Sequence, residues 1–266
     1  MIIIKKILLV VLIFILIIIG IKNNKIQKQK TSNWNKIPFY KEENINRYES
    51  YTKKNPDKSL EEIVTEVNIG IDTPFYSRIK PSNTKNYHYM LVNKFNYLNN
   101  NFVPEKMVKI DNTQLEIKAA LEFRNMQKEA QKQKLNIIAI SGYRSYEYQN
   151  TLYNSYVSKD SKEKADTYSA RAGHSEHQTG LAVDVSAGNS PYTEFENSKE
   201  FEWLKENAHK YGFILRYPKN KEYITGYIYE AWHYRYVGIE IALYIKKHNI
   251  TFDEYYVKFI DNNQQK

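Results

Sequence analysis

The feature that most constrains the fold is a carboxylate inside an otherwise apolar segment, Asp184 in Leu-Ala-Val-Asp-Val at residues 181–185. A short apolar run of this kind, preceded by Gly180, predicts a buried strand. Burying an ionised carboxylate without a partner costs free energy. A positively charged partner, such as a bound metal ion, would give the burial of Asp184 a physical reason.

Two histidines stand in short motifs that supply further ligands. His177 belongs to Ser-x-His-x-x-Gly-x-Ala-x-Asp, which ends at Asp184, and His233 ends Glu-Ala-Trp-His at residues 230–233. Zinc accepts neutral imidazole and carboxylate, and a catalytic zinc site keeps three protein ligands so that water can take the fourth position. The chain has no cysteine, so a metal must use histidine and carboxylate. We predict that His177, Asp184 and His233 bind zinc.

Three other side chains would complete a hydrolytic site. Glu230 lies three residues before His233, near enough to take a proton from zinc-bound water and pass it to a leaving amine. Arg144, in Ser-Gly-Tyr-Arg-Ser at residues 141–145, has a planar guanidinium that suits a developing oxyanion or a substrate carboxylate. Gln149 could share in carboxylate recognition through its amide. The pattern predicts metal-assisted hydrolysis of the kind that peptidases perform.

These motifs resemble those of the D-alanyl-D-alanine carboxypeptidase family, which includes vancomycin-resistance carboxypeptidases and L,D-carboxypeptidases. The resemblance runs from about Val67 to Tyr256. The matching segments are residues 91–94, 141–145 with Gln149, 175–184 and 230–235. The chain departs from the family at Ala172, where relatives often have proline, and this position is no ligand.

The resemblance implies a zinc enzyme with a small α+β fold that removes the terminal D-alanine from peptidoglycan stem peptides. It assigns His177, Asp184 and His233 as the zinc ligands and Glu230 as the catalytic base. It assigns Arg144 as a transition-state or substrate arginine, and Gln149 and Ser175 as substrate contacts. We expect one Zn²⁺ per chain, and we expect a monomer.

Three functions fit these residues. A D,D-carboxypeptidase would trim pentapeptide stems, and an L,D-carboxypeptidase would trim tetrapeptide stems with the same metal chemistry. Both need a pocket for a terminal D-alanine carboxylate, so the difference between them depends on the loops at residues 151–171 and 217–229. A non-catalytic zinc-containing module that binds the cell wall is the third, and the presence of Glu230 counts against it.

The N-terminal segment is typical of membrane targeting. Residues 7–21 carry no charge and are interrupted only by Gly20. As a helix they would rise about 22 Å, less than the roughly 30 Å hydrocarbon core, so either flanking lysines snorkel or the segment is a signal-peptide core. Because no Ala-x-Ala type of cleavage site follows, we favour an uncleaved signal anchor over residues 1–22.

The orientation of this anchor follows from function rather than from charge. Four lysines follow the apolar run and two precede it, a count that would place the body of the protein inside the cell. We nevertheless expect a cell-membrane protein with a single N-terminal pass and an extracellular catalytic domain, because the site implies an extracellular substrate.

The rest of the chain predicts a spacer and one domain. Residues 23–58 are rich in Lys, Asn and Gln without a sustained period, which predicts a spacer with no fold of its own. Residues 59–260 form the expected zinc peptidase domain. Its predicted helices are 59–67, 111–135, 145–156, 199–211 and a final one at 239–247, and its predicted strands are 137–140, 181–185, 213–217 and 227–234. Helices and short strands without βαβ alternation predict an α+β fold, with helices packed on a small antiparallel sheet.

The charge of the chain argues against nucleic-acid binding. The net charge is +9, but six lysines and no acid lie in the first thirty residues, so the remainder is only mildly basic. Acids and bases are interspersed there, whereas nucleic-acid-binding domains usually gather their basic residues on one stripe.

Overall fold

The computed structural model describes residues 15–17 and 33–261. The chain divides into two compact units, residues 1–68 and 69–266. Among the described residues, no helix is long and apolar enough to cross a membrane. The predicted anchor, residues 1–22, lies outside the described residues except for residues 15–17.

The described part of the N-terminal unit is helical. Its elements are η1 Trp34–Lys36, η2 Glu42–Asn44, α2 Ile45–Lys54 and α3 Leu60–Ile69. These helices share a buried cluster that includes Trp34, Tyr48 and Ile63. The prediction that the spacer lacks a fold of its own is therefore wrong for residues 33–58. Helix α3, which we expected to open the peptidase domain, packs in this unit instead.

The second unit is built on a four-stranded sheet in which every neighbouring pair is antiparallel, as predicted. The strands lie in the order β5-β6-β8-β7 and span Ile137–Ser141, Ala182–Ala187, His233–Tyr236 and Phe213–Leu215. Strand β8 begins later than the predicted strand at 227–234. The amides of Ile228 and Glu230 donate to the carbonyls of Thr167 and Tyr217, so this segment is held as a loop.

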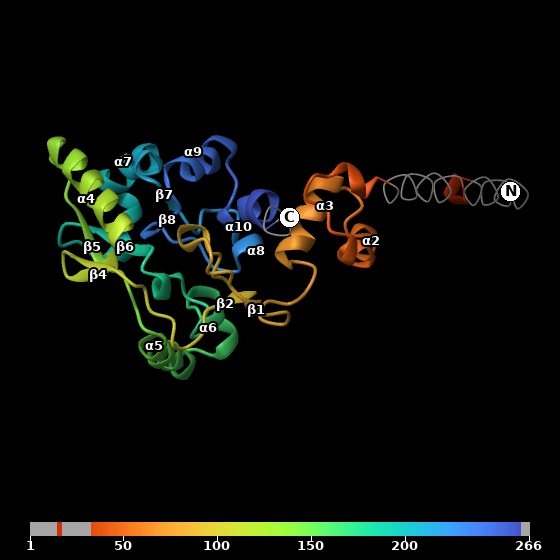
Figure 1. Cartoon of the computed structure of the whole chain (residues 1–266), viewed down its shortest axis with the longest axis horizontal. Coiled ribbons are helices and arrows are strands. Elements are labelled where there is room, and N and C mark those ends of the chain that lie inside the picture. Colours follow the sequence, from red (N-terminus) through yellow and green to blue (C-terminus); the bar gives the residue numbers. More distant parts are fainter. Residues whose placement is uncertain (1–14, 18–32, 262–266) are drawn as a thin grey trace, which may run out of the picture. The chain divides into compact units, whose positions relative to one another are not determined.

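Helix α4, Ile117–Lys132, covers one face of this sheet, beside β5 and β6 in Figure 1. It buries Phe123 and Met126 against sheet residues such as Val183. The hairpin of β3 Met107–Ile110 and β4 Thr113–Glu116 precedes it, so the predicted start at residue 111 is wrong. Asp111 has φ 47°, a left-handed conformation that turns the chain between strands and cannot begin a right-handed helix.

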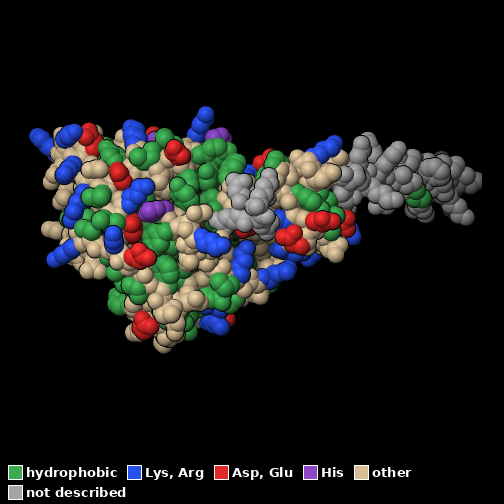
Figure 2. Space-filling view, in the orientation of Figure 1, with side chains coloured by type: hydrophobic (Ala, Val, Ile, Leu, Met, Phe, Trp, Pro, Cys, Tyr) green, Lys and Arg blue, Asp and Glu red, His purple; other side chains and the backbone are tan. Residues whose placement is uncertain are grey.

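The second unit contains further helices. They are η3 Tyr87–Tyr89, α5 Tyr146–Lys159, α6 Lys162–Tyr168, η4 Glu176–Thr179, η5 Tyr192–Asn197, α7 Lys199–Asn207, η6 Ala208–Tyr211, α8 Glu222–Thr225, α9 Ile239–His248, α10 Phe252–Tyr255 and the π-helical turn η7 Tyr256–Ile260. The short strands β1 Lys80–Pro81 and β2 Asn96–Tyr97 pair in parallel. Helix α5 begins at the Ser145 cap as predicted, whereas α9 is not the final helix. On the face in view in Figure 2, lysines and arginines are interspersed with acidic side chains.

Candidate metal centre

Strand β6 presents Asp184 on the face opposite α4. Side chains alternate along a strand, and the neighbouring Val183 and Val185 are fully buried in the core that contains α4. The register then pairs Asp184 with Ser141 of β5 on one side and with His233 of β8 on the other. Two of the three predicted ligands therefore lie directly opposite each other on neighbouring strands.

The third ligand, His177, lies on the short helix η4. Ser175 caps this helix, and Gly180, at φ 67°, ends it in a left-handed conformation that leads the chain into β6. The Nδ1 atom of His177 lies 2.6 Å from the carbonyl oxygen of Gly142, an acceptor that requires the proton on Nδ1. The lone pair of Nε2 is then free for a metal, and Nε2 lies 3.3 Å from Asp184 Oδ2.

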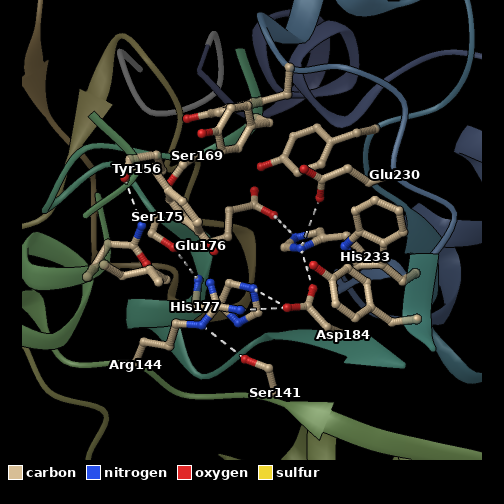
Figure 3. Close-up of a pocket in the computed structure, with 18 of the residues that line it drawn as sticks. Ser141, Arg144, Tyr156, Ser169, Ser175, Glu176, His177, Asp184, Glu230 and His233 are labelled. Atoms are coloured by element: carbon tan, nitrogen blue, oxygen red, sulfur yellow. Dashed lines mark hydrogen bonds and ion pairs between the residues drawn. The ribbon is translucent and has the colours of Figure 1, made fainter. Parts of the chain in front are cut away.

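His233 faces Asp184 through Nδ1, whereas His177 does so through Nε2. Its Nδ1 lies 2.9 Å from Asp184 Oδ1 and 3.8 Å from Glu230 Oε2. One ligand atom from each of His177, Asp184 and His233 lies within 4.8 Å of the others, and all three residues are buried. Figure 3 shows these side chains pointing toward one another from separate segments. Two imidazole nitrogens and one carboxylate match the donor set of a catalytic zinc site.

The charges around this group favour a bound cation. Burial would raise the pKa of Asp184, but His177 and Arg144 hold it well below its usual range. Burial and Arg144 lower the pKa of His177, which suits a neutral ligand. Burial would also lower the pKa of His233, yet the carboxylates of Asp184 and Glu176 raise it to about 9. The carboxylates thus attract positive charge to the position that a metal would take.

Glu230 is a buried acid beside the three predicted metal ligands. Burial raises the pKa of Glu230 to about 8. A zinc ion beside it would add positive charge and lower that pKa, because a bound cation dominates the local electrostatics. The carboxylate of Glu230 thus lies next to the predicted metal ligands, where the sequence places the base.

Arg144 is fixed to the ligands through both its backbone and its side chain. Its backbone amide donates to the carbonyl of His177 at 3.2 Å. Its Nη2 donates to Asp184 Oδ2 at 2.6 Å, and its Nε donates to Ser141 Oγ at 3.0 Å. A guanidinium has five N–H donors, so these two leave further donors for a substrate.

Gln149 and Ser175 line the same cavity as Arg144. The buried amide of Gln149 donates from Nε2 to the carbonyl of Ala170 at 2.8 Å, which fixes its orientation. The oxygen Oγ of Ser175 accepts from the amide of His177 at 3.3 Å, so its hydroxyl proton can point elsewhere. The second Nε2 proton of Gln149 and the hydroxyl proton of Ser175 take no part in these two bonds, which leaves two donors for the predicted carboxylate contact.

All the predicted site residues line one cavity of about 550 Å³. Beside the polar site residues, its wall includes aromatic and aliphatic side chains such as Tyr148, Tyr192, Ile228 and Trp232. Trp232, which packs edge-on against Tyr192, therefore contributes to the cavity as well as to the core.

Sequence reasoning missed Glu176. This residue is 1% exposed and its Oε2 lies 3.8 Å from Nε2 of His233, on the side away from Asp184. The signal available was an acid next to a predicted ligand, but nothing in the sequence placed it against the second histidine.

The comparisons with known proteins agree with this geometry. The family model of the VanY D-alanyl-D-alanine carboxypeptidase matches residues 112–239. The protein YodJ of Bacillus subtilis (strain 168) is 40% identical over 181 residues, 63% of this chain and 66% of YodJ. The solved structure of the LdcB LD-carboxypeptidase is 37% identical, with a TM-score of 0.62, over 68% of this chain and 90% of that one. The chain belongs to the D-alanyl-D-alanine carboxypeptidase family.

Membership of this family confirms the resemblance. The matched family and the matched structure are carboxypeptidases, which are peptide hydrolases, the class of enzyme that the sequence predicts. The vancomycin-resistance D,D-pentapeptidase VanY of the VanB-type cassette is solved in complex with Zn(II). It is 33% identical, with a TM-score of 0.58, over 64% of this chain and 98% of that one. With the His-Asp-His group found here, this structure supports the predicted zinc centre. The chain spans just under two thirds of the length of YodJ.

Proposed function

We propose that this chain is a zinc-dependent D-alanyl-D-alanine carboxypeptidase that removes the terminal D-alanine from peptidoglycan stem peptides. The observation that carries the proposal is one cavity that holds both a metal-ligand group with its adjacent base and a set of carboxylate-binding donors. An enzyme that cleaves the last peptide bond needs these two features side by side. The similarity to YodJ, LdcB and VanY supports the same reading.

The residues of the chain have distinct tasks in this reaction. A zinc ion held by His177, Asp184 and His233 supplies a Lewis acid and a water of lowered pKa. Glu230 accepts a proton from the attacking water and delivers it to the nitrogen of the departing D-alanine, so the water is added across the cleaved bond. Arg144 donates to the oxygen on which negative charge develops.

Recognition of the chain end falls to Gln149 and Ser175. Nε2 of Gln149 gives one of its two protons to the carbonyl of Ala170, and we assign the second proton to the substrate carboxylate. Together with Ser175 and Arg144, it provides donors for the two oxygens of a terminal carboxylate.

An L,D-carboxypeptidase acting on tetrapeptide stems is the second candidate. The observation in its favour is the similarity to LdcB, which extends over 90% of that chain. The metal and carboxylate sites would serve both reactions. The cavity walls at Tyr168, Tyr217 and Ile228 belong to residues 151–171 and 217–229, the segments expected to seat the penultimate residue, although helices α5 and α6 rather than loops make up most of the first segment.

The location and assembly stay predictions from the sequence. We propose that residues 1–22 anchor the protein in the cell membrane, with the catalytic unit outside the cell and acting as a monomer. Protease accessibility on intact cells and light scattering of the purified chain test these two points.

The experiment for specificity uses the full chain with pentapeptide and tetrapeptide stems, with and without a chelator, and identifies products by mass. We expect chelator-sensitive loss of one alanine from the pentapeptide. Loss from the tetrapeptide alone would establish the L,D alternative. No product from either peptide with zinc bound would overturn the proposal in favour of a binding module.

A further inference from the structure

A buried ionic cluster lies behind His233, on the side away from Asp184. At its centre, Glu176 Oε2 and His233 Nε2 lie 3.8 Å apart. Within the described part of the chain, both atoms are buried and neither has a hydrogen-bond partner. A donor and an acceptor this close, with nothing else to satisfy them, need only a small movement to pair.

The other oxygen of Glu176 is firmly held. Its Oε1 accepts from Arg216 Nε at 2.8 Å and from Arg235 Nη1 at 2.9 Å, and all three side chains are fully buried. Arg235 follows His233 by two residues on β8, so both side chains lie on the same face of the sheet. The two arginines therefore fix the carboxylate with its second oxygen directed at the histidine.

The arginines are themselves anchored. Arg235 donates to the carbonyls of Met90 and Tyr236. Arg216 donates from Nη1 to Asp253 Oδ2 at 2.6 Å, and Asp253 in turn accepts from the amide of Asn93 at 2.8 Å. Because apolar side chains can stabilise a core at least as well as a buried ionic cluster, stability alone gives a weak reason for this arrangement.

We propose that Glu176 is a positioning residue for the zinc site: it accepts a hydrogen bond from His233 and thereby selects the tautomer that presents Nδ1 to the metal. An ionised carboxylate can only accept, so the proton of His233 must be on Nε2 and the lone pair on Nδ1. Such outer partners orient a ligating imidazole and increase its basicity. The inference rests on the proposed zinc site but not on the identity of the substrate.

The two ligand histidines then have opposite tautomers, each set by its own buried acceptor. His177 gives its Nδ1 proton to the carbonyl of Gly142 and keeps Nε2 for the metal. His233 gives its Nε2 proton to Glu176 and keeps Nδ1. A carboxylate partner polarises an imidazole more than a carbonyl does, so Glu176 should have the larger effect on zinc affinity.

The test is the variant Glu176→Gln, which keeps the shape of the side chain. If its amide oxygen stays with the arginines, its NH₂ group faces Nε2 of His233 and favours the wrong tautomer. We expect zinc binding, measured by competition with a chelator, to weaken roughly 10- to 100-fold. We also expect an altered absorption spectrum when cobalt replaces zinc. Glu66→Gln is the matched control, because Glu66 is a buried acid paired with Lys58 in the N-terminal unit.

If the buried ionic cluster only stabilises the fold, the variants should behave differently. In that case Glu176→Gln and Asp253→Asn would both lower the melting temperature of the metal-free chain, and neither would change the zinc affinity or the cobalt spectrum. Unchanged zinc binding and an unchanged spectrum in Glu176→Gln would therefore overturn the proposal.

A second measurement needs no variant. Nitrogen-15 NMR of histidine-labelled, zinc-loaded protein reports which ring nitrogen carries the proton. We expect a proton on Nε2 of His233 and on Nδ1 of His177, whereas a proton on Nδ1 of His233 would overturn the proposal. Neither readout depends on hydrolysis, so a failure of the proposed carboxypeptidase activity would be distinguished from a failure of this inference.

Discussion

His233 lies directly across from Asp184 on neighbouring antiparallel strands, with its Nδ1 atom 2.9 Å from Asp184 Oδ1. The backbone register of β6 and β8 sets this pair, so the sheet itself places two of the three predicted metal ligands. Only His177 must be brought in by a turn, which Gly180 provides.

Replacing the base tests the chemistry apart from the metal. In Glu230→Gln, we expect turnover on a pentapeptide stem to fall by roughly 10²- to 10⁴-fold, because the proton acceptor is lost while all three zinc ligands remain. Zinc content and melting temperature should stay near those of the parent chain. The exposed Glu240→Gln is the control, and turnover near the parent value in Glu230→Gln would refute the assigned role.

Arginine at position 144 should not be replaceable by lysine. Arg144→Lys keeps the charge but loses the planar fork that reaches Asp184 and Ser141 together. We expect kcat/KM to fall at least about tenfold, with zinc still bound. Arg124→Lys, at an exposed arginine of α4, provides the comparison, and equal kcat/KM in both variants would contradict the prediction.

The turn before β6 should tolerate no side chain. Gly180 has φ 67°, and an added Cβ would lie 3.2 Å from the backbone nitrogen of Glu116. The left-handed conformation alone costs an alanine about 1–2 kcal/mol. We expect Gly180→Ala to lower the free energy of unfolding more than Gly188→Ala. Gly188 also has a left-handed φ, but a Cβ added there would contact only the Asn136 side chain, at 3.4 Å. Urea unfolding of both variants measures this difference. An equal loss of stability in the two variants would show that the contact with the backbone of Glu116 has no effect.

Acid should destabilise the fold partly through Glu116. Burial raises the pKa of this carboxyl, but hydrogen bonds from His88 and the first amides of α4 lower it by more, so the net pKa lies below the ordinary value of 4.5. A lowered pKa means that the ionised group stabilises the folded state above pH 4.5 and loses this contribution as the pH falls through the folded pKa.

The variant Glu116→Gln measures this contribution. Its free energy of unfolding in urea should lie below that of the parent chain at pH 7, and the gap should narrow as the pH approaches 3. A gap of the same size at both pH values would show that the carboxylate charge has no part in it.

The helices that begin at clear caps could be predicted from the sequence. Ser145 and Ser198 accept hydrogen bonds from amides in the first turns of α5 and α7, close to the predicted starts. The start of α4 was wrong because the spacing of Leu115 and Ala119 fits a helix, while the left-handed Asp111 allows a hairpin. The core formed around Trp34 and Tyr48 was missed, since these residues show no period in a polar segment.

The metal ligands were accessible to sequence reasoning because each stands in a short motif. Glu176 was not, since its role comes from Arg216 and Arg235, which lie 40 and 59 residues further along the chain. Only the sheet register brings these arginines behind His233, and no local pattern encodes that register.

The most direct measurement is the rate of D-alanine release from a pentapeptide stem by metal-depleted protein as zinc is added back. We expect no release without zinc, a linear rise, and a plateau at one zinc per chain. The variant His233→Ala should bind no zinc and stay inactive throughout the titration. Release that does not depend on zinc, or a His233→Ala variant that holds one zinc and turns over, would contradict the assignment of this centre.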